Sequence, residues 1–360
     1  MQRLWSDLES RADATLFQSW PWISNWWKVW GEALGLCPVV IGIWKHDQLV
    51  AMAPFYTRDY SLMPGLRLKQ LQMMGNVWRG ANTVRSEYTR PLTDSKFERE
   101  LQGILAEVLG KLKWDDMVLP DVEESGPATF WKDVDAYTVI RQEDTSWFVD
   151  THDGDFEGYL SSLGKNTRLK LYNRRQWAND RYGMLHEWID PDDFHAVARF
   201  LEQLNEFHVT RWGAPAFDLR ATAFHLAMIQ ALPPAHVRLG VLRAGDQVVS
   251  VSYNLQYRNT LYNLQSGYIE DFDRKLSLGT LHMGYVIEWA FQMHEVARYD
   301  LLAGEGKRTA YKGHLSTHDT SFLTVQLVRH PLFRLGVKLY GRAPLTVRRW
   351  LQRTLRPYSG

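Results

Sequence analysis

Two stretches of this 360-residue chain resemble each other and so constrain the whole fold. IGIWKHDQLVAMAPFY (residues 41–56) and LGVLRAGDQVVSVSYNLQY (residues 239–257) share a glycine, an Asp-Gln pair and alternating apolar residues. Gly42 answers Gly240, with one residue of offset in the turn. Alternation around a short polar turn indicates a β-hairpin, and hairpins do use similar turn residues. Each hairpin follows a helical region and precedes further strands, so we predict an internal duplication.

The bulk properties favour a globular protein of two domains. The length exceeds what one hydrophobic core usually holds. A formal net charge of +1 gives no overall attraction to nucleic acid or to membranes. Because Cys37 is the only cysteine, no intrachain disulfide can form, and we expect Cys37 to be a buried core thiol. The first residues are partly acidic, unlike a signal peptide, so a cytoplasmic location is expected.

The order of elements predicts an α/β (α+β) fold with two similar halves, each a mixed β-sheet flanked by helices. We assign residues 1–145 to the first half, 146–325 to the second, and 326–360 to a basic tail. The polar residues 121–145 are interpreted as the connection between the halves. Helices are expected over residues 21–34, 94–113, 155–180, 191–207, 217–231 and 280–295.

Tryptophan is abundant, with sixteen residues, and several of them lie near the N-terminus. Trp22, Trp26 and Trp30 recur at the spacing of one helical face. This face either packs its helix onto the first half or forms an aromatic wall of a substrate cleft.

The most informative segment is YNLQSGYIEDFDRKLSLGTLHMGYVIEWAFQM, residues 262–293. It reads as a strand, a polar loop and then a helix whose N-terminus forms an anion site. The alternative is an ordinary capped helix after a solvated basic loop. The candidate site consists of two basic side chains, two cap residues, the leucine between them and a glycine that allows close approach of a ligand: Arg274, Lys275, Ser277, Leu278, Gly279 and Thr280.

Three motifs resemble the GNAT superfamily of acyltransferases. They are DRKLSLGTLHMGYVIEWA, YDLLAGEGKRTAYKGHLS (residues 299–316) and SSLGKNTRLKLYNRRQWANDRYG (residues 161–183). The resemblance is closer to the CelD-like acetyltransferase branch, with FemAB-type aminoacyl transferases as relatives. It covers most of residues 145–320 and implies tandem GNAT-like domains. It also implies an acyl-CoA co-substrate, whose pyrophosphate binds at the loop before the helix. The usual signature Q/R-x-x-G-x-G/A is reduced here to one glycine, Gly279.

The same resemblance assigns chemistry to particular residues of the second half. Tyr311 and Lys312 are expected near the donor, where Tyr311 protonates a leaving thiolate and Lys312 neutralises negative charge. Glu305 or Asp300 is a candidate general base, although either carboxylate could instead cap a turn or be solvated. A backbone N–H for the oxyanion is expected from the strand residues Ser266, Gly267 and Tyr268.

The acceptor is expected in the cleft between the halves. Two loop segments that mix charge and aromatic surface are candidates to line it, Glu87-Tyr88 and Arg211-Trp212. The basic stretch at residues 165–181, which includes Arg168, is either a solvated helix face or a contact for an anionic acceptor or tRNA.

Residues 320–360 contain eight Lys or Arg and no Asp or Glu. Leu345, Trp350 and Leu351 lie among arginines, which suits either a helix docked on its own domain or peripheral contact with the inner membrane face. The twelve histidines show no ligand spacing, so no metal is expected.

The combined reading is acyl transfer from acyl-CoA, acetyl-CoA or longer, to an amine or hydroxyl of a small molecule or glycan precursor. Cell-envelope or exopolysaccharide biosynthesis is the expected setting. One alternative replaces the donor with aminoacyl-tRNA, and nucleic acid is an expected partner only there. The other alternative is a non-catalytic scaffold at the membrane surface.

Overall fold

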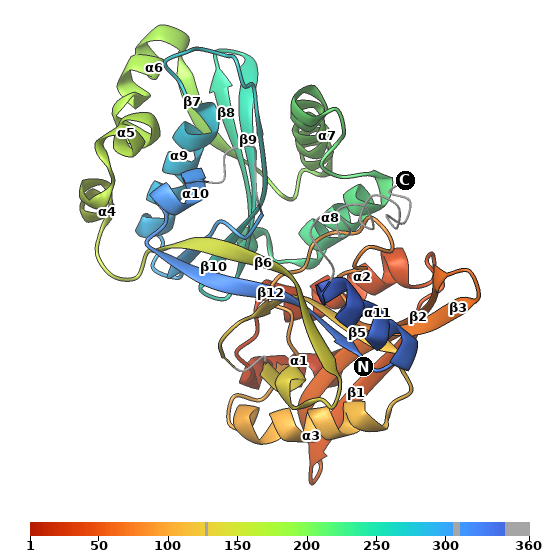
Figure 1. Ribbon diagram of the computed structural model, residues 1–360. Coiled ribbons are helices and arrows are strands. Elements are labelled where there is room, and N and C mark those ends of the chain that lie inside the picture. The colour runs from red at the N-terminus through yellow and green to blue at the C-terminus, as the bar shows by residue number, and fades with distance from the viewer. Residues whose placement is uncertain (127–128, 305–309, 343–360) are drawn as a thin grey trace.

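The protein is built around one large β-sheet, shown by a computed structural model that describes residues 1–126, 129–304 and 310–342 (Figure 1). The described residues contribute twelve strands to this sheet. They are β1 (Cys37–Lys45), β2 (Gln48–Met63), β3 (Leu66–Met73), β4 (Leu92–Thr93), β5 (Asp116–Glu123), β6 (Tyr137–Asp150), β7 (Met184–Ile189), β8 (Val237–Ala244), β9 (Gln247–Tyr257), β10 (Thr260–Tyr268), β11 (Arg298–Asp300) and β12 (His318–Val328).

The strand order is β1-β2-β3-β5-β12-β6-β11-β10-β9-β8-β7. Apart from β7, its two ends mirror each other: β1, β2, β3 and β5 correspond to β8, β9, β10 and β11. The pairing directions repeat as well. β1, β2 and β3 pair antiparallel, as do β8, β9 and β10. The next pair in each half, β3–β5 and β10–β11, is parallel. The duplication and the α/β fold class predicted from the sequence are therefore confirmed.

The two halves exchange their last strands at the centre of the sheet. β6, from the end of the first half, pairs with β11 of the second. β12, from the end of the second half, pairs with β5 of the first, and β6 and β12 pair with each other. The connection predicted over residues 121–145 is shorter in the structure, because residues 121–123 end β5 and residues 137–145 begin β6. The assigned boundary at residue 145 falls inside β6, so the two-domain division stays a proposal.

The hairpins β1–β2 and β8–β9 are equivalent, but not in the register expected from sequence. Each carries a β-bulge near the end of its first strand. The turns match through His46 and Gly245, whose φ angles are 53° and 56°. With the turns superposed, Gly42 lies one residue closer to its turn than Gly240 does to its own. The predicted equivalence of Gly42 and Gly240 was therefore wrong.

Helices pack around the sheet, and α3 and α9 occupy matching places, since each connects the two parallel strands of its half (Figure 1). The α-helices are α1 (Gln2–Arg11), α2 (Trp20–Trp26), α3 (Glu98–Lys111), α4 (Phe156–Ser162), α5 (Lys165–Arg168), α6 (Arg175–Tyr182), α7 (Phe194–Trp212), α8 (Leu219–Ala231), α9 (Leu278–Gln292), α10 (Ala310–Leu315) and α11 (Pro331–Arg342). The 3₁₀ and π turns are η1 (Leu16–Gln18), η2 (Trp27–Gly31), η3 (Thr129–Asp133), η4 (Leu169–Asn173) and η5 (Pro234–His236).

Local sequence explains several helix boundaries. The side chains of Ser19, Asp193 and Asp218 accept hydrogen bonds from backbone N–H groups and begin α2, α7 and α8. Gly213, with a φ of 79°, ends α7 five residues beyond the predicted end. The single helix expected over residues 155–180 is three helices with a π turn, broken first before Gly164.

The tryptophan face of α2 and η2 lies in the core. Trp22, Trp26 and Trp30 are each 1% exposed or less, and their rings pack against Tyr56 and Phe224. They hold the helix on the sheet and do not line a cleft. Cys37, in contrast, is exposed, so its predicted burial was wrong. It begins β1, an edge strand because no first-half strand corresponds to β7.

The predicted tail begins inside β12 and continues as α11. Its remaining part, with Leu345, Trp350 and Leu351, lies outside the described residues. No helix of the described ranges is long and apolar enough to cross a membrane.

Candidate active site at the junction of the two halves

The open edge of β10 forms one side of the candidate site. β10 and β11 pair only from Thr260 to Tyr262, after which β10 continues to Tyr268 alone on that side. Ile269 donates its N–H to Val249 of β9, so the N–H groups of Ser266 and Tyr268 face the open side. The Ser266 N–H is already bonded to the Gln265 side chain, and the Ser266 carbonyl lies 3.1 Å from His208 Nε2. Of the three residues predicted to offer an N–H to the oxyanion, only Tyr268 has an N–H that faces the open edge and is not bonded to a described side chain. The N–H of Gly267 points towards β9.

The first turn of α9 adjoins this edge and has the character of an anion site. No described side chain caps the helix, and the Ser277 hydroxyl contacts Thr280 Oγ1 at 3.1 Å instead. Leu281 donates to the Ser277 carbonyl, and the N–H groups of Leu278, Gly279 and Thr280 have no acceptor among the described residues. Three aligned N–H groups at the positive end of a helix dipole suit a phosphate.

Gly279 has a role that differs from the predicted one. A Cβ atom at this position would lie 2.6 Å from Cε1 of the Tyr268 ring. The glycine is therefore needed to seat Tyr268 against the helix, which holds the end of β10 beside the anion site. In the structure, the group that approaches the Gly279 backbone closely is this ring, whereas the sequence predicted a ligand there.

Arg211 and Tyr311 join Tyr268 at the same end of β10. The Arg211 guanidinium lies 4.8 Å from the Tyr268 ring centroid and 2.8 Å from Glu270. Burial and the nearby Tyr268 raise the pKa of Tyr311 to about 12. The Tyr311 phenol therefore stays protonated at neutral pH and remains a proton donor.

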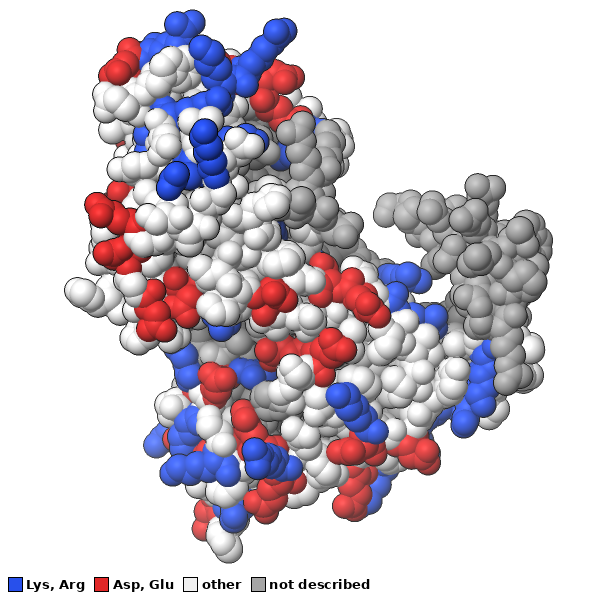
Figure 2. All heavy atoms as spheres, turned by 60° about the vertical axis from the view of Figure 1, so that its left-hand side comes forward, with Lys and Arg blue, Asp and Glu red and all other residues white. Residues whose placement is uncertain are grey.

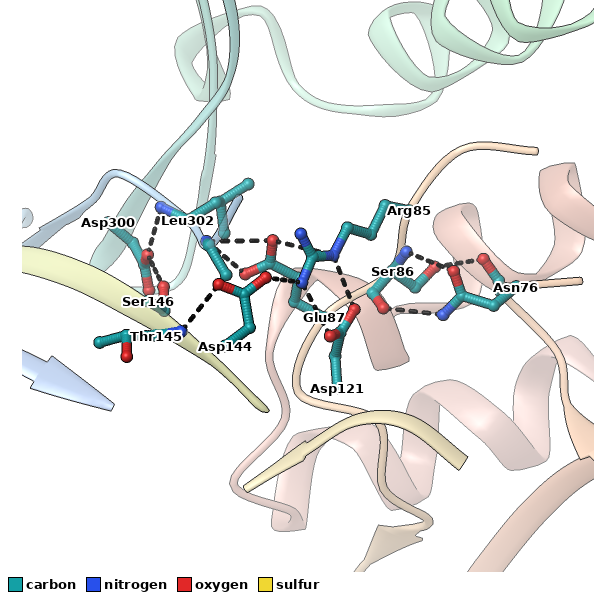
Figure 3. Close-up of polar contacts among 12 residues, drawn as sticks. Asn76, Arg85, Ser86, Glu87, Asp121, Asp144, Thr145, Ser146, Asp300 and Leu302 are labelled. Atoms are coloured by element: carbon teal, nitrogen blue, oxygen red, sulfur yellow. Dashed lines mark hydrogen bonds and ion pairs between the residues drawn. The ribbon is translucent and has the colours of Figure 1, made fainter. Parts of the chain in front are cut away.

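A charged cluster lies where the halves meet, and Figure 3 shows its carboxylates converging on Arg85, whose side chain is 37% exposed. The Arg85 guanidinium binds Asp121 through two contacts of 2.7 and 2.8 Å. It also binds Asp144 at 2.7 Å, and Glu87 lies 3.6 Å from its Nε. These carboxylates come from the loop before β4 and from β5 and β6, so Arg85 ties three segments together.

Asp300, at the end of β11, is fully buried in the same cluster. Its carboxylate accepts hydrogen bonds from the Tyr88 hydroxyl at 2.5 Å, the Ser146 hydroxyl at 3.0 Å and the Leu302 N–H at 2.8 Å. Three donors orient this carboxylate, and with no exposed surface it is not open to a substrate in this structure. Asp300 is therefore a positioning residue, in place of the predicted general base.

Glu87 and Lys312 both form hydrogen bonds to the loop that follows β11. The Glu87 carboxylate is 2% exposed and accepts the Ala303 N–H at 2.9 Å. Lys312 donates to the carbonyls of Leu302 and Ala303 at 2.8 and 3.3 Å. Burial raises the pKa of Glu87 to about 8, although Arg85 opposes the shift. Burial lowers the pKa of Lys312, although Glu87 and Asp300 oppose that shift.

The backbone around this cluster is strained. Tyr88, Asp121 and Leu302 have φ angles of 52°, 50° and 57°, in the left-handed region that non-glycine residues rarely adopt. All three contact the cluster, directly or through their neighbours. Such conformations persist where the surroundings fix them, and they concentrate at functional sites.

The structure unites some of the predicted site residues and separates others. Glu87, Tyr88, Asp300 and Lys312 lie in the charged cluster. Arg168 lies on α5 with no described contact to it, and the Trp212 ring lies 5.0 Å from the Arg211 guanidinium. Lys275 lies over the Trp177 ring at 5.4 Å, in the loop with Arg274. Glu305 falls outside the described residues.

Sequence reasoning missed Arg85, Asp121, Asp144 and Ser146. Arg85 lies two residues before Glu87 in VRSEY, so its closeness to the candidate pair Glu87-Tyr88 could have drawn attention to it. The other three lie within or beside strands and gave no signal of their own. In the described part of the chain, no three His, Cys, Asp or Glu side chains converge as metal ligands.

The comparisons with known proteins agree with this architecture. Residues 165–313 match the family model described as acetyltransferase (GNAT) domain. The fold is similar to that of FemX, with 14% identity, a TM-score of 0.59, and coverage of 93% of this chain and 97% of FemX. It is also similar to L-PGS from Bacillus licheniformis, with 11% identity, a TM-score of 0.52, and coverage of 99% and 97%.

A third similar structure is the C-terminal domain (DUF2156) of an Agrobacterium fabrum protein assigned as a lysylphosphatidylglycerol synthetase. It shows 10% identity, a TM-score of 0.56, and coverage of 93% of both chains. The comparison with curated proteins gave no match. The matched segment begins with α5, ends within α10, and contains the first turn of α9, the open edge of β10 and Lys312. The chain thus contains, over residues 165–313, a domain of the GNAT acyltransferase superfamily, as its motifs predicted.

Proposed function

We propose that the second half binds an acyl-CoA donor and that the acyl group passes to an amine or hydroxyl acceptor at the junction of the halves. The observation that carries this proposal is the uncapped first turn of α9 inside the matched GNAT domain. Its free N–H groups, with Arg274 and Lys275 in the preceding loop, suit the pyrophosphate of a coenzyme A thioester.

The equivalent helix of the first half supports placing the donor in the second half alone. α3 carries Glu98 and Glu100 in its first turn, whereas the first turn of α9 has no acidic residue. Two carboxylates at a helix N-terminus complement the dipole themselves and repel a phosphate. The first half is therefore the acceptor side in this proposal.

The residues at the end of β10 would handle the thioester. The Tyr268 N–H is the donor proposed to stabilise the oxyanion as negative charge develops on the carbonyl oxygen. The Tyr311 phenol is proposed to give its proton to the departing thiolate. Bound acyl-CoA itself supplies the activated carbonyl carbon.

Glu87 is the proposed proton acceptor on the acceptor side. The acceptor nitrogen or oxygen forms a bond to the carbonyl carbon, the carbon–sulfur bond breaks, and the acceptor proton passes to Glu87. A carboxylate whose pKa is about 8 is a stronger base than an exposed one, but it is mostly protonated at pH 7, so this role requires a rate that rises with pH through about 8. Lys312 holds the 302–303 loop in place and limits the negative charge around Glu87.

A second candidate donor is aminoacyl-tRNA. The fold matches nearly the full length of FemX, of L-PGS and of the lysylphosphatidylglycerol synthetase domain, which supports aminoacyl transfer in the cell envelope. Figure 2 shows Lys and Arg side chains gathered over the α5–α6 end of the molecule, a surface suited to a polyanion.

Thermal unfolding with acetyl-CoA, longer acyl-CoAs and free CoA tests the proposal. A ligand at 100 times its dissociation constant stabilises the folded state by about 2.7 kcal/mol, so a clear rise in Tm is expected. No shift with any of them would refute an acyl-CoA donor. Binding of tRNA that weakens steeply with salt would then favour the second candidate, and no response to either ligand would indicate a non-catalytic scaffold.

A further inference from the structure

Helix α11 presents an apolar face that nothing in the described structure covers. Leu332, Leu335 and Leu339 are 63%, 54% and 59% exposed. Their spacing of three and four residues puts them in one stripe along a helix of twelve residues. The opposite face carries Phe333 and Val337, which are half-buried against the protein. A helix that is apolar on both faces is normally buried on both.

This cluster of leucines is unlike the other exposed leucines of the described residues. Leu4, Leu185 and Leu219 are also exposed, but each lies on a different element: α1, β7 and α8. Single exposed apolar residues are ordinary on protein surfaces, whereas a contiguous stripe indicates an interaction surface.

Two basic side chains lie along one side of the leucine stripe. The Arg334 guanidinium and the Lys338 ammonium lie 5.7 and 5.2 Å from the Tyr137 ring centroid, which fixes them along one side of α11. The sequence from residue 320 to 360 adds further arginines, for eight basic and no acidic residues. Whatever covers the leucines must therefore tolerate a concentration of positive charge.

We propose that α11 docks on an anionic lipid surface, with Leu332, Leu335 and Leu339 inserted among the lipids and Arg334 and Lys338 beside the headgroups. An apolar helix face with basic flanks is the arrangement that binds in the interface of such membranes. A second copy of this chain fits the face less well. A two-fold contact between two α11 helices would bring Arg334 and Lys338 of both copies together and repel.

Co-sedimentation of the full chain with vesicles tests this inference independently of the donor chemistry. One vesicle preparation contains phosphatidylglycerol mixed with phosphatidylcholine, and the other contains phosphatidylcholine alone. The protein is expected to bind the first at about 0.1 M salt and to dissociate at about 1 M, where the Debye length falls from about 10 Å to about 3 Å. Binding to neither preparation, or equal binding to both, would overturn the proposal.

Variants connect the result to α11. The triple variant Leu332→Ser, Leu335→Ser and Leu339→Ser is expected to lose about tenfold or more in vesicle affinity, because it removes the inserted apolar surface. The matched control replaces the scattered leucines Leu4, Leu185 and Leu219 with Ser and is expected to bind as the unaltered protein does.

Far-UV circular dichroism and Tm establish that both triple variants fold. Equal vesicle binding by the two would contradict the inference. So would a concentration-dependent dimer that the α11 variant abolishes, if the unaltered protein binds no vesicles. That result would place a second copy on this face.

Discussion

The buried carboxyl of Glu87 makes the free energy of unfolding depend on pH, and Glu87→Gln should remove that dependence. The pKa of Glu87 is about 8 in the folded protein because its carboxyl is buried. In the unfolded chain a glutamate has a pKa of about 4.3. The folded state therefore holds a proton that unfolding releases. This stabilisation is complete below about pH 4.3 and is lost as the pH rises through about 8.

The size of the effect follows from these two values. Raising the pH from 6 to 8 should reduce the contribution of Glu87 to the free energy of unfolding by about 2 kcal/mol. Glutamine is neutral at both pH values, and its side-chain carbonyl can still accept the Ala303 N–H. The variant should therefore show a smaller decrease over the same range, with the difference equal to this amount.

Urea unfolding followed by circular dichroism at pH 6 and pH 8 measures the difference. Glu107→Gln is the matched control, because Glu107 is an exposed carboxylate paired with Lys111 at 2.6 Å. The control should keep the pH dependence of the unaltered protein. Parallel pH dependence in the unaltered protein and in Glu87→Gln would refute the claim that Glu87 holds its proton through burial.

Three further variants test single contacts of the site by urea unfolding. Tyr88→Phe leaves the buried Asp300 carboxylate without one of its donors and should cost about 1–3 kcal/mol; an unchanged stability would show that this hydrogen bond contributes nothing. Gly279→Ala puts a Cβ against the Tyr268 ring and should cost about 1–3 kcal/mol, whereas Gly103→Ala, where a Cβ meets nothing within 4 Å, should not. Lys312→Met removes the counter-charge of Glu87 and should lower the free energy of unfolding by about 3–5 kcal/mol at pH 8. The loss should be smaller at pH 6, because Glu87 is protonated there. Equal losses at both pH values would count against the pairing.

The elements that could be predicted from the sequence are those whose signals are local. The hairpin pattern gave the duplication, and the loop before α9 gave the start of that helix, because turn residues and helix starts depend on neighbouring residues. The exchange of β6 and β12 could not be predicted, since it pairs Tyr137 with Val328 and strand pairing of that range leaves no local pattern. Cys37 was misplaced for the same reason, because its exposure depends on β1 being at the edge.

The site residues divide in the same way, into those with a local signal in the sequence and those without one. Glu87 and Tyr88 were singled out because charged and aromatic residues adjoin in a loop, and Lys312 through the family resemblance; the roles assigned to them stay predictions. The role of Asp300 was misjudged because its partners Tyr88 and Ser146 are 212 and 154 residues away. A carboxylate at the end of a buried strand looks like a base until the donors that surround it are known.

The affinity for CoA of a Ser277→Asp variant, measured by isothermal titration calorimetry, tests most directly the claim that the α9 N-terminus binds the donor. Asp is as good an N-cap residue as Ser, so the variant should keep its fold and its Tm. Its carboxylate would occupy the first turn and repel a pyrophosphate, so the affinity for CoA should fall about tenfold or more. Unchanged affinity in the variant, or no binding by the unaltered protein, would contradict the account.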